Sequence, residues 1–291
     1  CELIHCLPTN YRLNFGEEIK DPRNIFGENL SVDIMLGLVP DMIYRNLATV
    51  IENAHLEIVG KAFSAYASGL ACLVDDEKEI GATVVDIGGG MTSIASFRHG
   101  FPVYFSSIPV GGNNVTNDIA FGLTTSFAHA ERLKTLHGCA FLTRKDSEET
   151  INVYPVGEED DSSIKQITKA ELISIITPRI EEIFELVNQK LEEQGLKDIS
   201  SHRVVLTGGG SQLSGIREVA TMVLDKQVRI GRPKNISNLP EILYNPAYST
   251  CIGLLLFALN YTERKPNKIV NKPAGNSGAL GKILGWIKQN F

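Results

Sequence analysis

Two glycine-rich turns, about 120 residues apart, each follow a short apolar strand, and they constrain the fold more than any other feature of the chain. The first strand, Ala82 to Ile87, ends at three consecutive glycines, and the second, Val204 to Leu206, ends at Thr207 and three more. The second turn leads into an apolar helical segment. A strand, turn and helix in this order present backbone N–H groups at the end of a sheet. The pair therefore predicts an α/β fold whose turns are suited to a nucleotide.

The first turn has the composition of a phosphate-binding loop. Glycine permits backbone conformations with positive φ and lets N–H groups approach phosphate oxygens. Asp86, near the end of the strand, could hold Mg²⁺ directly or through water. Most turns of three glycines are only tight hairpins, so this interpretation depends on the presence of the second turn.

Cysteine and histidine usage argues against a metalloprotein. The 291 residues, 43% of them hydrophobic, suffice for about two domains. The five cysteines are odd in number and scattered, with no Cys-x-x-Cys pair, which fits a reducing cytoplasm. The six histidines show no zinc-ligand spacing, so no metal held by protein ligands alone is expected.

The longest apolar run of the body, Leu254 to Leu259, is far shorter than the roughly 20 residues that span a bilayer.

Charge is divided unevenly along the chain. The formal net charge is −6, but the residues from Glu263 onward carry six cations against one anion, which leaves −11 on the rest. An acidic body argues against nucleic acid as its partner, and a basic tail favours an anionic surface. Residues 263–276, rich in Pro, Asn and Lys, have the composition of a flexible linker.

Residues 277–291 have the pattern of an amphipathic helix that lies on a membrane surface. The apolar face consists of Leu280, Ile283, Leu284, Ile287 and Phe291, with Trp286 at its margin. Lys282, Lys288 and Gln289 lie on the other side. Such a helix could instead dock on the body of the protein or on a second subunit. The polar linker, the basic charge and the tryptophan at the margin favour the membrane.

Hydrophobic periodicity predicts alternating helices and strands along the body. Strands are expected at 56–59, 82–87, 92–97, 103–110, 203–206 and 228–230. Helices are expected at 40–54, where Pro40 and Asp41 open the pattern, and at 65–74, 115–121, 126–138, 214–224 and 248–261. Thr168 and Glu171 form a capping-box signature for a further long helix that ends near Gly195, and Pro178 should kink it or divide it in two.

The chain opens with an apolar segment, Leu3 to Leu7, that has the character of a strand already under way. We therefore expect the sequence to be a fragment cut inside a domain. Residues 1–38 alternate short apolar segments with turn signals and are expected to form a small mixed unit. A boundary between two main lobes is expected near 76–80.

The two turns resemble those of the actin, Hsp70 and sugar-kinase superfamily, which binds ATP with Mg²⁺. The resemblance implies that Asp86, Gly88, Gly89, Gly90 and Thr92 form the second phosphate loop and that Gly208, Gly209 and Gly210 form the adenosine loop. It also implies that Glu131 binds the ribose hydroxyls and that Lys134 lies along the adenine. The alternative for these two residues is a solvated ion pair one helical turn apart.

Two departures from the superfamily bear on ATP binding. The phosphate hairpin continues Gly90-Met-Thr-Ser where catalytic relatives usually have Gly-Thr-x-Asp, and the first phosphate loop is absent from this sequence. We therefore expect the 291-residue chain to bind ATP poorly if at all and the intact protein to bind it well. No catalytic residue is assigned beyond Asp86 as a candidate for positioning Mg²⁺ or water.

Three further stretches resemble the FtsA family of bacterial cell-division proteins in particular: 19–30, 110–120 and 248–254. The resemblance implies an actin-like ATPase fold of two ribonuclease-H-like lobes, truncated at its N-terminus and followed by the C-terminal amphipathic helix. The implied divisions are part of an inserted subdomain at 1–38, the end of the first lobe at 39–76, the second lobe at 77–262 with a smaller subdomain at about 112–200, the linker at 263–276 and the membrane helix at 277–291.

The family resemblance implies a scaffold rather than a conventional enzyme. Such proteins polymerise on the cytoplasmic face of the inner membrane at the division septum, as peripheral proteins. They hold the division protein FtsZ there by its C-terminal peptide, through the smaller subdomain, and they meet other division proteins. ATP hydrolysis is expected to be slow or regulatory at most. The alternatives are an actin-like ATPase of pilus assembly and an ATPase of the sugar-kinase or Hsp70 type.

Overall fold

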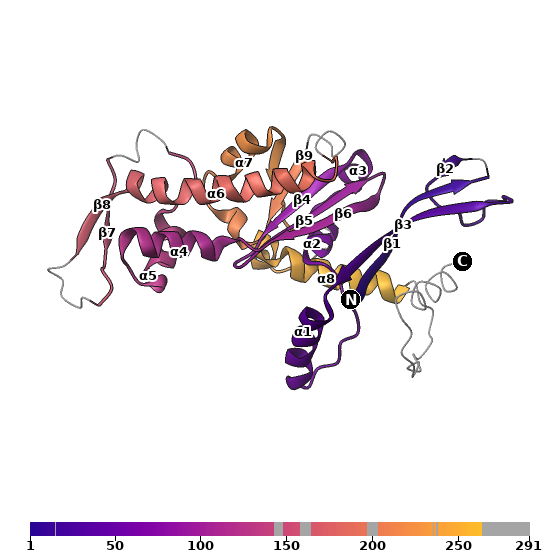
Figure 1. Cartoon of the computed structure of the whole chain (residues 1–291), viewed down its shortest axis with the longest axis horizontal. Helices are drawn as coiled ribbons and strands as arrows, with labels where there is room; N and C mark the ends of the chain where they lie inside the picture. The colour runs from indigo at the N-terminus through magenta and orange to yellow at the C-terminus, as the bar shows by residue number, and fades with distance from the viewer. Residues whose placement is uncertain are drawn as a thin grey trace.

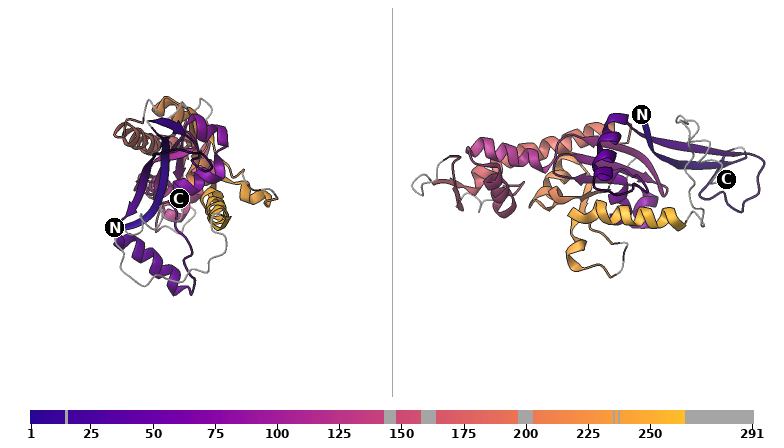
Figure 2. Two further views of the ribbon diagram at one scale, coloured as in Figure 1. Left: turned by 90° about the vertical axis from the view of Figure 1, so that its right-hand side faces the viewer. Right: turned by 90° about the horizontal axis from the view of Figure 1, so that it is seen from below.

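The computed structural model describes residues 1–14, 16–142, 148–157, 164–196, 203–234, 236 and 238–263. The molecule is elongated, with a five-stranded sheet at its centre and smaller sheets toward its two ends (Figures 1 and 2). Within the described ranges, no helix combines the length and apolar character that a membrane span requires.

The central sheet has the strand order β10-β9-β4-β5-β6. Its strands are β4 (Ala82–Ile87), β5 (Thr92–Arg98), β6 (Phe101–Ile108), β9 (Arg203–Thr207) and β10 (Gln227–Ile230). β4 pairs in parallel with β9, and β9 with β10, whereas β5 and β6 are antiparallel additions on the other side of β4. All five strands were predicted to within about two residues at their ends.

Helices cover both faces of this sheet, which explains why β4 is buried along its whole length. Because side chains alternate along a strand, Val84 and Val205 face one core, together with α2 (Ser64–Cys72) and α8 (Ser249–Glu263). Val85 and Leu206 face the other core, together with α6 (Lys169–Glu192) and α7 (Ile216–Leu224). Strands buried on both faces appear in the sequence as continuous apolar runs.

One end of the molecule is built from α4 (Gly112–Leu123), α5 (Phe127–His137) and α6. The predicted caps are confirmed: Ser126 caps α5, and Thr168 and Glu171 form the capping box of α6. α6 is one continuous helix with Pro178 inside it, so the division into two helices is wrong. The short strands β7 (Thr150–Val153) and β8 (Lys165–Thr168) pair beside α6 and were not predicted, because four half-polar residues carry too little periodicity.

The opposite end is a three-stranded antiparallel sheet of β1 (Glu2–Leu13), β2 (Glu17–Ile19) and β3 (Leu30–Val39). The described part of 1–38 therefore consists of strands rather than a mixture of helix and strand. α1 (Asp41–Asn53) follows and was predicted, but the strand expected at 56–59 is wrong. This segment has no strand to pair with, and Leu56 and Val59 are exposed.

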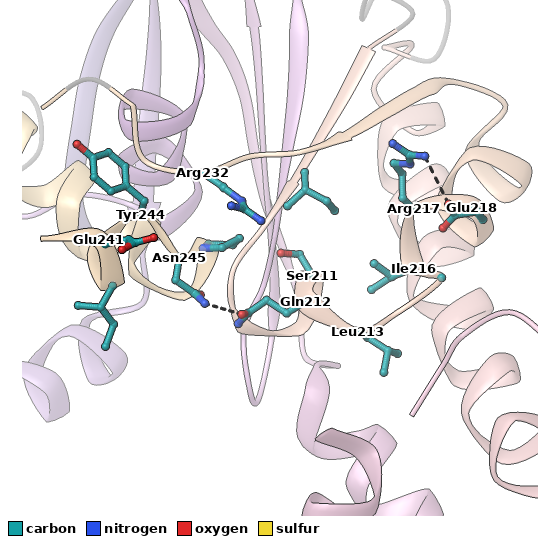
Figure 3. Close-up of a pocket in the computed structure, with 14 residues that line it drawn as sticks. Ser211, Gln212, Leu213, Ile216, Arg217, Glu218, Arg232, Glu241, Tyr244 and Asn245 are labelled. Atoms are coloured by element: carbon teal, nitrogen blue, oxygen red, sulfur yellow. Dashed lines mark hydrogen bonds and ion pairs between the residues drawn. The ribbon is translucent and has the colours of Figure 1, made fainter. Parts of the chain in front are cut away.

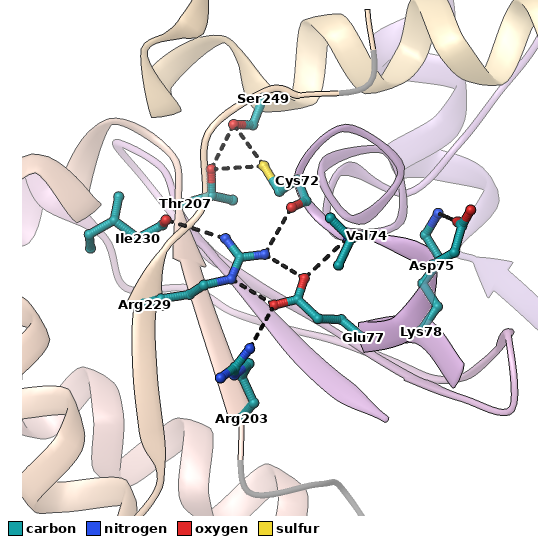
Figure 4. A network of polar contacts seen from close by, with 10 residues as sticks. All are labelled: Cys72, Val74, Asp75, Glu77, Lys78, Arg203, Thr207, Arg229, Ile230 and Ser249. Carbon is teal, nitrogen blue, oxygen red and sulfur yellow. Dashed lines mark hydrogen bonds and ion pairs between the residues drawn. The ribbon is translucent and has the colours of Figure 1, made fainter. Parts of the chain in front are cut away.

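The segment 76–80, where a lobe boundary was expected, forms the short helix α3 (Asp75–Ile80), and the division into lobes there stays a prediction. Glu77 of α3 is buried and receives hydrogen bonds from the Arg229 guanidinium, with Arg203 close by (Figure 4). Arg229 also donates to the backbone oxygen of Cys72, at the end of α2. Burial alone would raise the pKa of Glu77, but its hydrogen bonds and the two arginine charges outweigh burial and lower it. The network ties α2 and α3 to the edge of the central sheet.

His5 anchors β1 to the body of the protein. Its imidazole is 3% exposed, lies against the rings of Phe63, Tyr66 and Phe105, and accepts a hydrogen bond from the backbone N–H of Phe63 at 3.0 Å. Burial lowers the pKa of His5 from 6.5 to about 4. The folded protein therefore holds a neutral imidazole at pH values where the unfolded chain is already protonated.

This burial predicts an acid-sensitive fold. Between pH 6.5 and 4 the unfolded state binds more protons than the folded state, so stability is complete above this window and is lost as the pH falls through it. Lowering the pH from 7 to 5 should cost about 2 kcal/mol through His5 alone. Urea unfolding at the two pH values measures the change. A His5→Gln variant keeps a side-chain acceptor that does not titrate, and an unchanged pH dependence in this variant would rule out His5 as the source.

Candidate functional site

The parallel pairing of β4 with β9 brings the two glycine-rich turns together. Asp86 lies in register with Thr207, so the strands end at the same edge of the sheet. A Cβ atom at Gly208 would lie 2.5 Å from the backbone oxygen of Ile87, and one at Gly210 would lie 3.1 Å from the same atom. Gly208 has φ +82° and ψ 168°, a conformation that in practice only glycine adopts. The second turn thus packs against the last residue of β4, directly before the first turn, and residues about 120 positions apart form one surface.

The first turn leaves three consecutive amides free. Gly88 donates its N–H to the backbone oxygen of Met91, and the carbonyls of Gly88 and Gly89 accept from the first residues of α4 at 2.9 and 2.7 Å. Among the described residues, the N–H groups of Gly89, Gly90 and Met91 have no acceptor, and all three residues are exposed. A Cβ at Gly90 would meet no atom within 4 Å. Exposed, unpaired amides in a turn favour an anionic ligand.

Asp86 lies beneath these turns rather than in open solvent. It is 7% exposed, and its Oδ2 accepts hydrogen bonds from the hydroxyls of Ser68 at 2.5 Å and Thr250 at 2.7 Å. Neither hydroxyl was singled out from the sequence, although Thr250 falls in one of the stretches that carry the family resemblance. Thr92 is fully buried and donates to the backbone oxygen of Val110 at 2.8 Å, so its hydroxyl serves the fold of the hairpin.

Glu131 and Lys134 do form the ion pair predicted from their spacing, at 2.7 Å. The two partners differ in exposure: the Lys134 side chain is only 15% exposed and its Nζ also donates to the Gly112 oxygen at 3.1 Å, whereas the Glu131 side chain is 42% exposed. The Thr116 hydroxyl completes the group with hydrogen bonds to both side chains. Burial would raise the pKa of Glu131, but the hydrogen bonds from Lys134 and Thr116 and the Lys134 charge lower it. The pair therefore lies against the start of α4, next to the first turn.

An open pocket of about 910 Å³ adjoins the second turn (Figure 3). It is lined by the residues that follow this turn, by the end of β10 and by the segment 241–246. The Asn245 amide donates to Gln212 Oε1 at 2.6 Å across its rim. None of Asp86, Gly88, Gly89, Gly90, Glu131 or Lys134 lines it. The pocket was not predicted, because its residues come from three separate segments without a shared motif.

Two further expectations concern metals and the tail. Within the part of the chain that the structure describes, no three His, Cys, Asp or Glu side chains gather in a group that could hold a metal ion. The predicted membrane-facing residues, Leu280, Ile283, Leu284, Trp286, Ile287 and Phe291, lie outside the described residues, as does nearly all of the linker at 263–276.

Comparison with solved structures identifies the fold. The chain resembles MreB5 of Spiroplasma citri bound to ADP, with a TM-score of 0.63 and 20% identity over 77% of this chain and 67% of that one. It also resembles the PilM-PilN type IV pilus biogenesis complex, with a TM-score of 0.59 and 19% identity over 82% of this chain and 64% of that one. At this level of identity the likeness establishes the actin-like ATPase fold.

Comparison with sequences identifies the family. A family model described as cell division protein FtsA matches residues 83–253, which include both glycine-rich turns. FtsA of Agrobacterium fabrum is 39% identical over 99% of this chain and 66% of its own length. FtsA of Escherichia coli is 32% identical over 99% of this chain and 70% of its own length. The chain thus spans about two thirds of these relatives, and it belongs to the FtsA family of cell division proteins.

Proposed function

We propose that the protein is an ATP-binding, actin-like scaffold that polymerises on the cytoplasmic membrane and tethers FtsZ to it at the division site. The observation that carries this proposal is the packing of the second glycine-rich turn against the end of β4, where the first turn begins. The neighbouring structures of MreB5, bound to ADP and to AMPPNP, support nucleotide binding at such a fold.

The residues present at the turns fit ATP with Mg²⁺. The free amides of Gly89, Gly90 and Met91 would donate to phosphate oxygens. The Gly208–Gly210 turn would pack against the adenosine, with Glu131 toward the ribose and Lys134 toward the adenine. Asp86 would orient the ion through a water molecule, since one of its oxygens already accepts two hydrogen bonds. Bound Mg-ATP would supply a triphosphate whose slow hydrolysis regulates assembly.

The remaining parts of the function follow from family membership. The smaller subdomain at about 112–200, which includes α4, α5, β7, β8 and α6, would bind the C-terminal peptide of FtsZ. Filament formation, other division proteins and a peripheral position at the septum complete the proposal. Identity of 39% to an FtsA favours this scaffold over a sugar-kinase or Hsp70-type ATPase. The PilM likeness, at 19% identity, extends only to the fold and does not favour pilus assembly.

Nucleotide binding can be tested at Gly90, where a new side chain would meet no other atom. Mg-ATP at about 5 mM should raise the melting temperature of the intact protein through its preference for the folded state. Gly90→Asp should abolish this rise, because a carboxylate would repel the phosphates, whereas Gly90→Asn should keep most of it. Differential scanning calorimetry measures the shift. A rise in the aspartate variant equal to that of the unaltered chain would show that this turn does not contact phosphate.

The membrane proposal is tested by deleting residues 277–291. The undeleted chain should pellet with anionic vesicles, and the deleted form should stay in the supernatant, because the apolar face and the nearby lysines supply the affinity. Trp286 is the only tryptophan, so its fluorescence reports insertion directly. Leu284→Glu should abolish the fluorescence change, and Gln289→Glu, on the polar face, should preserve most of it. Equal pelleting of the undeleted and deleted forms would contradict the tether.

A further inference from the structure

The Asp86 carboxylate is held by hydroxyls from two helices that are distant in sequence. Ser68 belongs to α2 and Thr250 to α8, and their oxygens lie 2.8 Å apart while both contact Asp86 Oδ2. Ser68 is fully buried. A carboxylate oxygen can only accept, and each hydroxyl has one proton to donate. Both hydroxyls therefore donate to Oδ2.

This arrangement leaves the two oxygens of Asp86 with different roles. Oδ1 has no hydrogen bond to any described residue, and it lies on the side of the second turn, 2.3 Å from where a Cβ at Gly208 would be. The two hydrogen bonds fix the plane of the carboxylate, and turning it out of this plane would break them in a buried setting, which is costly. The hydroxyls therefore keep one carboxylate oxygen directed at the junction of β4 with the second turn.

We propose that Ser68 and Thr250 are positioning residues of the nucleotide site, which orient Asp86 so that Oδ1 acts on the Mg²⁺ that accompanies ATP. The inference rests on the proposed function and deepens it. Through these hydroxyls α2 and α8 become part of the site, although neither helix carries one of the glycine-rich turns.

A second group of hydroxyls on the same helices supplies a matched control. The Ser249 hydroxyl, next to Thr250 on α8, contacts Thr207 Oγ1 at 2.7 Å and Cys72 Sγ at 3.2 Å (Figure 4). Cys72 lies one helical turn after Ser68 on α2. This group is as buried as the first and joins the same two helices to the sheet, but it does not contact Asp86. A purely structural role of the hydroxyls would make the two groups equivalent.

The test compares the affinity of the intact protein, which includes the segment missing from this chain, for ATP with and without Mg²⁺, from thermal-shift titrations of Thr250→Val, Thr250→Ser and Ser249→Ala. In the unaltered protein Mg²⁺ should strengthen ATP binding, and the ratio of the two affinities is the Mg²⁺ gain. Thr250→Val should reduce this gain by roughly fivefold or more, since a charge-assisted hydrogen bond is lost. Thr250→Ser should restore the gain because it keeps the hydroxyl. Ser249→Ala should lower the melting temperature without changing the gain.

The outcomes separate this inference from the function on which it rests. If Thr250→Val lowers the melting temperature as Ser249→Ala does and leaves the Mg²⁺ gain unchanged, the hydroxyls only pack the helices and the inference is overturned. If the unaltered intact protein does not bind ATP under either condition, the proposed nucleotide site itself fails, and the inference fails with it. Ser68→Ala, on the other helix, should repeat the result of Thr250→Val, and an unchanged gain there would equally overturn the positioning role.

Discussion

Replacing Gly253 with alanine should destabilise the protein by about 3 kcal/mol or more, because the added methyl group has no room. Gly253 lies where α8 crosses α2, and a Cβ atom there would be 1.8 Å from the backbone oxygen of Ala67 and 2.2 Å from its carbonyl carbon. Both are main-chain atoms of a helix, so no side-chain rotation can relieve the contact. The helices would have to move apart, which would open the core of Val84, Val205 and Ile252.

Urea denaturation of the 291-residue chain measures this loss. The control is Cys251→Ala, an exposed position two residues earlier on α8, where the change should stay within about 0.5 kcal/mol. A Gly253→Ala variant as stable as this control would mean that α8 can shift freely on α2. That result would also weaken the argument that Thr250 is held rigidly against Asp86.

Replacing Gly208 with alanine should cost about 3 kcal/mol and also abolish ATP binding. Two effects combine at this position: the backbone has φ +82° with ψ 168°, which strains any residue with a Cβ, and that Cβ would lie 2.3 Å from Asp86 Oδ1. Relief requires displacing the carboxylate, the Ile87 carbonyl or the turn itself. Stability and ligand affinity should therefore fall together.

Gly209→Ala is the matched control for this prediction. The neighbouring glycine has no positive φ, and its Cβ would meet no atom within 4 Å. The control should lose no more than about 1 kcal/mol, as in other exposed turns. Calorimetric unfolding with and without Mg-ATP gives both quantities for each variant. Equal stabilities for the two alanine variants would contradict the close packing of the second turn against the end of β4.

The fold explains why a site can form from turns so far apart in sequence. Parallel strands carry their ends to one edge of a sheet, and here that edge also receives the start of α4 and the hydroxyls of α2 and α8. Five segments thus meet around Asp86 and the first turn. A substitution that displaces one of these segments should also displace its neighbours. The substitutions Gly208→Ala and Thr250→Val are therefore both expected to change the affinity for the nucleotide.

The sequence alone determined those features that depend on local periodicity and local chemistry. The five central strands, the cap of α5 and the capping box of α6 are each specified by residues within one segment, and all of them were predicted. The glycine-rich turns were recognised for the same reason, since each is a run of consecutive glycines directly after an apolar strand.

Only the tertiary structure decided the features that depend on contacts between segments. The segment 56–59 has the residues of a strand but no partner to pair with, and β7 and β8 are too short and polar to be seen except as a pair. Ser68 and Thr250 carry no local signal, because an isolated hydroxyl in a helix is common. Their role follows from the crossing of α2 and α8 above Asp86, a long-range packing arrangement that no short stretch of sequence encodes.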